Sequence, residues 1–178
     1  MAHTTVHDDE ATRPAARQDA VALLKADHRK VEGLFEAFEK ARGAARKAEL
    51  VKQICTELKV HTAIEEEIFY PACKGKIEGD LLDEAYVEHD AAKKLIAELE
   101  ASAPDEDFYD AKVKVLSEEI EHHVEEEEKR SEGMFAQARK AGLDMDALGD
   151  LMLARKVELL TGAKKGVEPP SEPRTFKE

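Results

Sequence analysis

The order of apolar and polar residues predicts four long amphipathic helices joined by short connections. Apolar residues recur three and four apart in each, the pattern of one buried helical face. Asp19 stands in an N-cap position before the first helix and Gly43 follows it, while Pro71 closes the second. The expected helices cover about residues 19–43, 50–71, 80–103 and 105–142. Long helices with short joints predict an all-α, up-down-up-down antiparallel four-helix bundle.

The two ends of the chain differ from this central region. An additional amphipathic stretch follows Asp144 and is expected to pack outside the bundle as a C-terminal helix. Residues 1–17 have no apolar period and are predicted to form a disordered tail. Residues 164–178 contain three prolines and are predicted to form a mobile tail. The folded domain is therefore expected to span residues 18–163.

Composition supports a helical domain and limits its partners. Charged residues make up 38% of the 178 residues, aromatic residues only 5%, and tryptophan is absent, which is typical of amphipathic helices. The net charge of −13 argues against nucleic acid and against anionic membranes, because phosphate binding needs clustered Lys and Arg. No apolar run reaches the length of a membrane span, and the N-terminus has no signal-peptide pattern. We therefore expect a cytoplasmic protein.

Polar residues interrupt each apolar stripe at one level. The interrupting histidines, one on each predicted helix, are His28, His61, His89 and His123. One histidine on an apolar face is usually a hydrogen-bonded core residue, but four on four helices favour a shared site. Glu65 and Glu127 each follow a histidine by one turn, which places imidazole and carboxylate side by side. Buried carboxylates require compensating cations.

The chain also repeats itself. A shift of 61 residues places the first of these histidines on the third, and a shift of 62 places the second histidine and its glutamate on the fourth histidine and its glutamate. Two similar hairpins packed together would unite four imidazoles and two carboxylates inside the bundle. Nitrogen and oxygen donors without sulfur favour iron or manganese, and zinc is possible. Two carboxylates among four histidines suit two ions better than one, although a mononuclear site or a metal-free polar core would use the same residues.

These motifs resemble a known family. His28, then His61-x-x-x-Glu65 in HTAIEEEIFYP, then His89 in YVEHD, then His123-x-x-x-Glu127 in HHVEEEE are similar to the haemerythrin-like (HHE cation-binding) domain. The resemblance runs from about residue 20 to 160. It implies two iron ions joined by an oxo or hydroxo bridge. It further implies that the four histidines are terminal ligands and that the two glutamates bridge.

The chain departs from the family pattern at the third helix and after the fourth. Oxygen-carrying members have a further histidine where this chain has Lys93, which argues against simple oxygen carriage. Water or Tyr86 is a candidate for the remaining coordination, with Tyr86 more often a core or rim residue. In the second hairpin Phe135 comes late and no proline follows, so the fourth helix is expected to run past the site with Arg130 on its core line near solvent.

Several neighbouring residues are candidates for lesser roles. His122 repeats the pairing with a glutamate one turn later, but it lies about a hundred degrees off the apolar stripe, which favours His123 as the ligand. Glu57 and Glu119 precede His61 and His123 by one turn. They would either orient the two rings as hydrogen-bond acceptors or face solvent.

Three classes of function are compatible with such a site. The first is a module that binds or responds to dioxygen, nitric oxide or peroxide. The second is an enzyme that decomposes peroxide in a catalase-like cycle or oxidises ferrous iron, since open metal positions favour turnover. The third is iron storage or metal handling. The expected partner is a small diatomic or peroxide ligand, no residue is assigned a catalytic role beyond the metal ligands, and the sequence indicates no protein partner.

Overall fold

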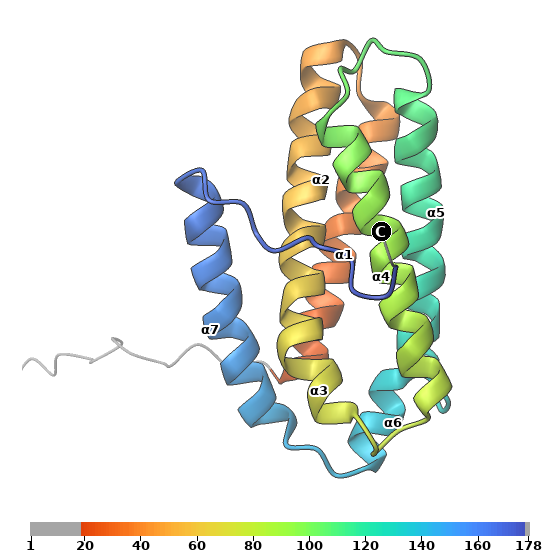
Figure 1. Cartoon of the computed structure of the whole chain (residues 1–178), viewed down its shortest axis with the longest axis vertical. Helices are drawn as coiled ribbons and strands as arrows, with labels where there is room; N and C mark the ends of the chain where they lie inside the picture. Colours follow the sequence, from red (N-terminus) through yellow and green to blue (C-terminus); the bar gives the residue numbers. More distant parts are fainter. Residues whose placement is uncertain (1–18, 177–178) are drawn as a thin grey trace, which may run out of the picture.

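The computed structural model describes residues 19–176, and within them the chain is helical without any strand. The elements are α1 (Ala20–Lys40), α2 (Ala44–Ile64), the π-helical turn η1 (Glu65–Phe69), α3 (Tyr70–Cys73), α4 (Gly79–Glu100), α5 (Tyr109–Glu128), α6 (Met134–Lys140) and α7 (Met145–Lys164). Helices α1, α2, α4 and α5 form an antiparallel bundle in which each helix packs against its neighbours, with α5 returning to α1 (Figure 1). The predicted fold class is confirmed. The predicted disordered tail at residues 1–17 lies outside the described residues.

The first two helices begin and end largely where the sequence predicts. The side chain of Asp19 caps α1 by accepting a hydrogen bond from the backbone N–H of Ala22 at 2.8 Å. Gly43 separates α1 from α2 at a φ of 82°, a conformation that favours glycine. The prediction that Pro71 ends the second helix is wrong by a short distance. The chain continues through η1 and α3 to Cys73, because Pro71 stands in the first turn of α3, where a missing N–H is tolerated.

The fourth bundle helix ends earlier than predicted. Helix α5 stops at Glu128, residues 129–133 form a turn, and α6 starts anew at Met134. Arg130 is therefore exposed in this turn, which corrects the prediction that it continues the core line. A Cβ atom on Gly133 would lie only 2.6 Å from the backbone nitrogen of Lys129 and 2.7 Å from the carbonyl oxygen of Glu127. Glycine thus permits the tight turn that breaks the helix.

The bundle core consists of two apolar clusters with a polar layer between them. On α1, Leu24 belongs to one cluster and Val31 to the other, with His28 between them. On α4, Ala85 and Ala92 are divided in the same way. Each large apolar side chain buried in these clusters contributes about 1.5–3 kcal/mol, which allows the fold to hold a polar layer that is unfavourable on its own. The candidate site therefore lies at mid-height of the bundle.

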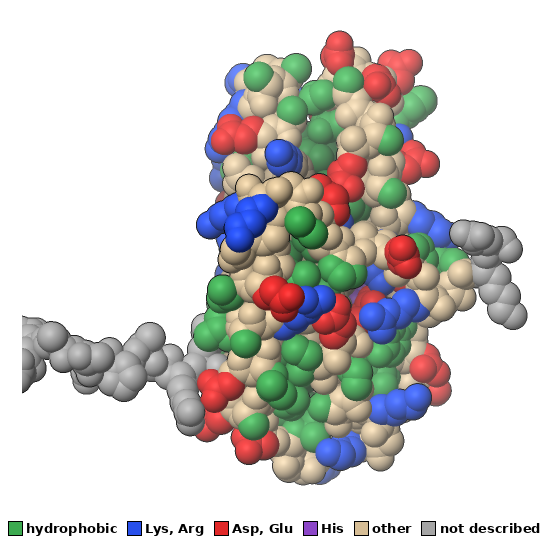
Figure 2. Space-filling model, turned by 60° about the vertical axis from the view of Figure 1, so that its left-hand side comes forward, with side chains coloured by type: hydrophobic (Ala, Val, Ile, Leu, Met, Phe, Trp, Pro, Cys, Tyr) green, Lys and Arg blue, Asp and Glu red, His purple; other side chains and the backbone are tan. Residues whose placement is uncertain are grey.

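Helix α7 lies outside the bundle against α1 and α2, as predicted for the additional C-terminal helix (Figure 1). Arg155 on α7 forms an ion pair with Glu67 at 2.7 Å, and Lys156 pairs with Asp27. Acidic and basic side chains lie next to one another at mid-height of the face drawn in Figure 2, without a large patch of either sign. No helix within residues 19–176 has both the length and the apolar content needed to cross a membrane.

The segment after α7 crosses from α7 to α4 (Figure 1). The sequence predicts a mobile tail from residue 164, and the structure corrects this for residues 168–175. Asp90 on α4 accepts hydrogen bonds from the backbone N–H groups of Arg174 and Thr175, at 2.7 and 2.5 Å. Lys59 on α2 contacts Glu168 at 2.5 Å. Proline content alone gave no sign of these polar contacts between helices and tail.

Candidate metal centre

The four predicted histidines meet in two pairs inside the bundle. The Nε2 atoms of His28 and His61 are 3.2 Å apart, and those of His89 and His123 are also 3.2 Å apart. All four rings are buried, with at most 5% of each residue exposed. Helices α1 and α2 supply one pair and α4 and α5 supply the other, as the repeat predicts.

The two glutamates connect the histidine pairs. Glu65 Oε2 lies 3.1 Å from His61 Nε2 and 3.3 Å from His89 Nε2. Glu127 Oε2 lies 3.4 Å from His28 Nε2, and its Oε1 lies 3.7 Å from His123 Nε2. Each glutamate thus reaches one histidine of each hairpin, which is the arrangement that a bridging carboxylate requires.

The donor atoms of these residues fit a pair of cations. Candidate ligand atoms within 4.8 Å of one another form two groups that share Glu65. The first group is His28, His61, Glu65 and Glu127, and the second is Glu65, His89 and His123. Glu65 Oε1 and Glu127 Oε2 are buried without any hydrogen-bond partner. Such oxygens are costly inside an apolar core unless a cation compensates them, so this donor set suits metal binding.

The acidic groups change the protonation of the rings. Burial alone would lower the pKa of His61, but the carboxylates of Glu65 and Asp27 outweigh burial and raise it to about 10. The pKa of His123 is likewise raised against burial by Glu127 and Glu88. Burial would raise the pKa of Glu65, yet the adjacent imidazoles hold it well below its usual value. In the absence of metal, protons therefore provide part of the positive charge that the carboxylates need.

A second set of carboxylates lies behind the rings, at their Nδ1 atoms. These carboxylates are Glu128 at 2.8 Å from His28, Asp27 at 3.6 Å from His61, Glu66 at 3.1 Å from His89, and Glu88 at 2.7 Å from His123. Each comes from the neighbouring helix and adjoins a candidate ligand in the sequence. The four helices are thereby linked in a closed cycle, in which the helix that supplies one ring also orients the next. A carboxylate at Nδ1 leaves Nε2 directed toward a metal.

Sequence reasoning considered a different pair of carboxylates for this role. Glu57 pairs with Lys30 at 2.6 Å instead of with His61. Glu119 Oε2 has no hydrogen-bond partner, and burial raises the pKa of this side chain. Of the two alternatives, an orienting role for Glu57 and Glu119 is therefore wrong. The correct residues were adjacent to the ligands in the sequence, a signal that was visible but was masked by the many other glutamates.

Tyr70 is a site residue that the sequence analysis missed. Its buried hydroxyl lies 3.1 Å from both His89 Nε2 and Glu127 Oε1. The π-helical turn widens the register by one residue, so the N–H of Tyr70 bonds to the carbonyl of Glu65, five residues earlier, and the two side chains share a face. Tyr86, considered for this position, instead packs its ring against that of Tyr70, with centroids 5.1 Å apart. Burial and the nearby carboxylates raise the pKa of Tyr70 well above its usual value, so its hydroxyl stays protonated.

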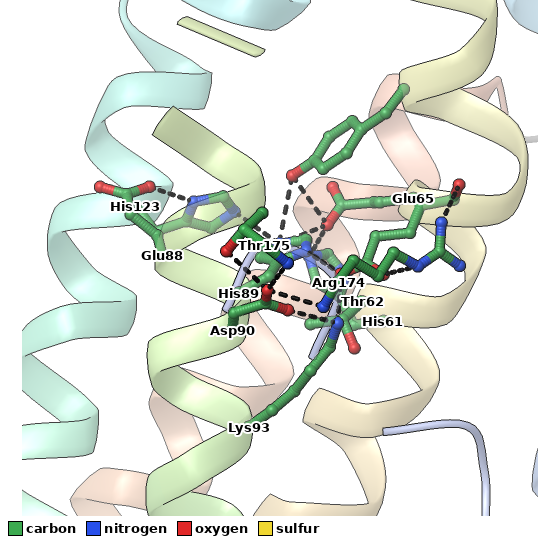
Figure 3. Close-up of polar contacts among 12 residues, drawn as sticks. His61, Thr62, Glu65, Glu88, His89, Asp90, Lys93, His123, Arg174 and Thr175 are labelled. Carbon is green, nitrogen blue, oxygen red and sulfur yellow. Dashed lines mark hydrogen bonds and ion pairs between the residues drawn. The ribbon is translucent and has the colours of Figure 1, made fainter. Parts of the chain in front are cut away.

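Lys93 does not reach the side of His89 that faces the metal centre. Its Nζ lies 2.7 Å from the Glu66 oxygen that also faces His89 Nδ1, and 3.1 Å from Asp90 (Figure 3). Its charge therefore stabilises a carboxylate behind the ring. The preference for His123 over its neighbour is consistent with exposure, because the side chain of His122 is 60% exposed and contacts Glu88.

A small cavity adjoins the histidines. Its volume is about 10 Å³, the room that one water-sized molecule needs. Its apolar wall consists of Val31, Leu58, Ile120 and Val124, and its polar wall includes the four histidines. The site therefore offers a small, mostly apolar space beside the nitrogen donors.

Comparison with known proteins supports the same conclusion. A solved structure of a protein from Mycobacterium kansasii that contains a haemerythrin HHE cation binding domain has the same fold, with a TM-score of 0.69 and 23% identity over 83% of this chain and 90% of that one. A DNA nickase from Nostoc sp. is 30% identical over 107 residues, which are 60% of this chain and 30% of the nickase. The model of the Hemerythrin HHE cation binding domain matches residues 19–135. This chain therefore belongs to the haemerythrin HHE cation-binding family.

Proposed function

We propose that the chain holds two iron ions and uses them to bind or respond to dioxygen, nitric oxide or peroxide. The ligands are the six residues named from the sequence: His28, His61, Glu65, His89, His123 and Glu127. The observation that carries the proposal is that Glu65 and Glu127 each reach both histidine pairs while keeping a buried oxygen without a partner. Imidazole and carboxylate donors without sulfur favour iron, with manganese or zinc as possible substitutes. A di-iron centre supplies electrons to small oxidising ligands.

The surrounding residues restrict what can enter. The cavity beside the histidines accepts a molecule of about water size, and its apolar wall disfavours ions. The carboxylates at Nδ1 fix the rings, so Nε2 remains available to metal. We do not extend DNA nicking to this chain, because it spans 30% of the nickase and carries a net charge of −13.

Metal content tests the proposal directly. Protein reconstituted anaerobically with ferrous iron and then desalted is expected to contain about two iron ions per chain by elemental analysis. His61→Ala should lose most of this iron, because it removes a donor and leaves the other groups of its cluster misaligned. His122→Ala is the matched control, one residue from His123 but exposed, and should keep both ions. Folded wild-type protein without iron would contradict the proposal.

Peroxide decomposition is a second candidate function, favoured by the hydroxyl of Tyr70. This O–H lies within 3.1 Å of His89 Nε2 and Glu127 Oε1, where it can donate a hydrogen bond to a small ligand. Lys93 supplies no donor on this side of the ring. Oxygen evolution from peroxide, measured with an electrode, should collapse in Glu127→Ala and persist in His122→Ala. A stable, reversible optical band on exposure to air, without oxygen evolution from peroxide, would instead favour binding.

A further inference from the structure

Residues 168–175, which we call the C-terminal strap, are tied to the bundle at both ends. At one end Lys59 of α2 contacts Glu168 at 2.5 Å. At the other, Asp90 Oδ2 accepts hydrogen bonds from the backbone N–H of Arg174 and from both the N–H and the hydroxyl of Thr175. Asp90 is completely buried and follows His89 directly. The strap is therefore docked on the residue next to a candidate metal ligand.

This docking delivers Arg174 to the carboxylate behind His89. Arg174 Nε lies 2.8 Å from Glu66 Oε2, while Glu66 Oε1 lies 3.1 Å from His89 Nδ1 (Figure 3). Only 3% of the Glu66 side chain is exposed. A buried carboxylate with a cation on each oxygen has little freedom to rotate. Arg174 and Lys93 together thus fix the acceptor that orients the His89 ring.

A second contact holds Arg174 on the same residue. Its Nη1 donates to the backbone carbonyl of Glu66 at 3.4 Å. In the register of η1, the donor for this carbonyl would be residue 71, five positions later, but Pro71 has no N–H. The π-helical turn therefore leaves an acceptor that the strap supplies with a donor. The side chain of Arg174 contacts both the carboxylate and the carbonyl of one residue.

The two hairpins differ in the source of these cations. Behind His28, Glu128 contacts Lys25 and Arg29, which lie on α1 with the histidine itself. Behind His89, one of the two cations comes from the strap, 84 residues beyond the α4 residue that holds it. The first arrangement forms with the bundle, whereas the second requires the C-terminal segment to dock.

We propose that Arg174 is a positioning residue for His89, and that the strap couples the C-terminal segment to the α4/α5 half of the metal centre. The part of this inference that concerns metal rests on the proposed function. The orientation of the His89 ring does not, because it is a property of the metal-free protein as well.

The first experiment measures metal release. Protein reconstituted with ferrous iron is mixed with excess chelator, and the two ions are expected to leave in two phases. Arg174→Gln should accelerate one phase about 3- to 10-fold, in the lower range for loss of groups that support a metal ligand. Arg174→Lys should recover part of the effect. Arg29→Gln should not accelerate that same phase, and Arg46→Gln, which breaks an exposed ion pair with Glu49, should change neither.

The second experiment needs no metal. The ring nitrogens of ¹⁵N-histidine-labelled metal-free protein report the Nδ1 hydrogen bond of each ring. Arg174→Gln, or a chain ending at Val167, should shift the His89 signals and leave those of His28 in place. A shift of this kind in a wild-type protein that binds no iron would support positioning while refuting the proposed function. Two bound ions, unchanged release and unchanged His89 signals in Arg174→Gln would refute positioning and leave the proposed function intact.

Discussion

The α1/α2 and α4/α5 hairpins present the same donors but leave the site in different ways. The first continues through η1, which directs Tyr70 onto the ring of His89 with centroids 5.3 Å apart. The second breaks after Glu128 and returns through α6, which stacks Phe135 on the ring of His28 at 5.9 Å. Each histidine on the first helix of a hairpin is thus covered by an aromatic ring from the other hairpin.

The difference shows that the repeat is stronger in space than in sequence. The ligands repeat at intervals of 61 and 62 residues, whereas Tyr70 and Phe135 are 65 residues apart. The turn at residues 129–133 absorbs the additional residues and still returns an aromatic ring to the equivalent place. What is not repeated is the hydroxyl, which only Tyr70 carries. The two iron positions would therefore be similar in ligands and unequal in the groups beside them.

The largest expected effect on the fold comes from the turn that ends the second hairpin. Gly133→Ala would place a Cβ about 2.6–2.7 Å from three backbone atoms, which cannot move aside as a flexible side chain can. We expect a loss of about 2–3 kcal/mol in the free energy of unfolding, measured by urea denaturation of metal-free protein. Gly33→Ala is the control, because nothing lies within 4 Å there and the position is helical. It should stabilise the protein by about 0.5–1 kcal/mol. Equal effects would contradict the described turn.

This turn marks where prediction from the sequence failed for the fold. The helical periodicity located α1, α2, α4, α5 and α7, because each buries one continuous face. The break after Glu128 depends on a backbone approach at Gly133 that no periodicity reports. The extension past Pro71 depends on a π-helical turn, and a change of helical register leaves the residue types unchanged.

The protonation of His61 provides the next prediction. Its pKa of about 10 in the folded, metal-free protein exceeds the ordinary value near 6.5. This group therefore contributes full stability below about pH 6.5, and the contribution is lost as pH rises through about 10. Iron must displace this proton, so apparent iron affinity should rise by up to about tenfold per pH unit in this range.

Calorimetry in two buffers of different protonation enthalpy measures the protons released when metal binds. Wild-type protein should release at least one proton per chain near pH 7.5, and His122→Ala should release the same number because its side chain lies outside the site. Metal uptake without proton release would mean that Glu65 and Asp27 do not hold a proton on His61.

The site was predicted in its ligands and missed in its surroundings. Histidines and glutamates on apolar faces stand out because burying them is unfavourable, so the six candidates could be found one by one. The four carboxylates at Nδ1 lie among the 40 acidic residues of the chain, and only the packing of neighbouring helices distinguishes them. Arg174 could not be found at all, since its role depends on the docking of a segment that is polar and rich in proline.

Exchanging the hydroxyl between the hairpins tests their inequality with the smallest change in structure. Tyr70→Phe removes hydrogen bonds to Glu127 and His89 and should cost about 1 kcal/mol of stability. Phe135→Tyr adds a hydroxyl where Phe135 is only 3% exposed, and should cost about 1–2 kcal/mol unless the new O–H finds a partner. If the hydroxyl assists peroxide decomposition, Tyr70→Phe lowers the rate of oxygen evolution at unchanged iron content. The double variant then tells whether one hydroxyl serves equally from either side. Recovery would make the two halves interchangeable, whereas a rate as low as that of Tyr70→Phe would place the reactive position on the His89 side.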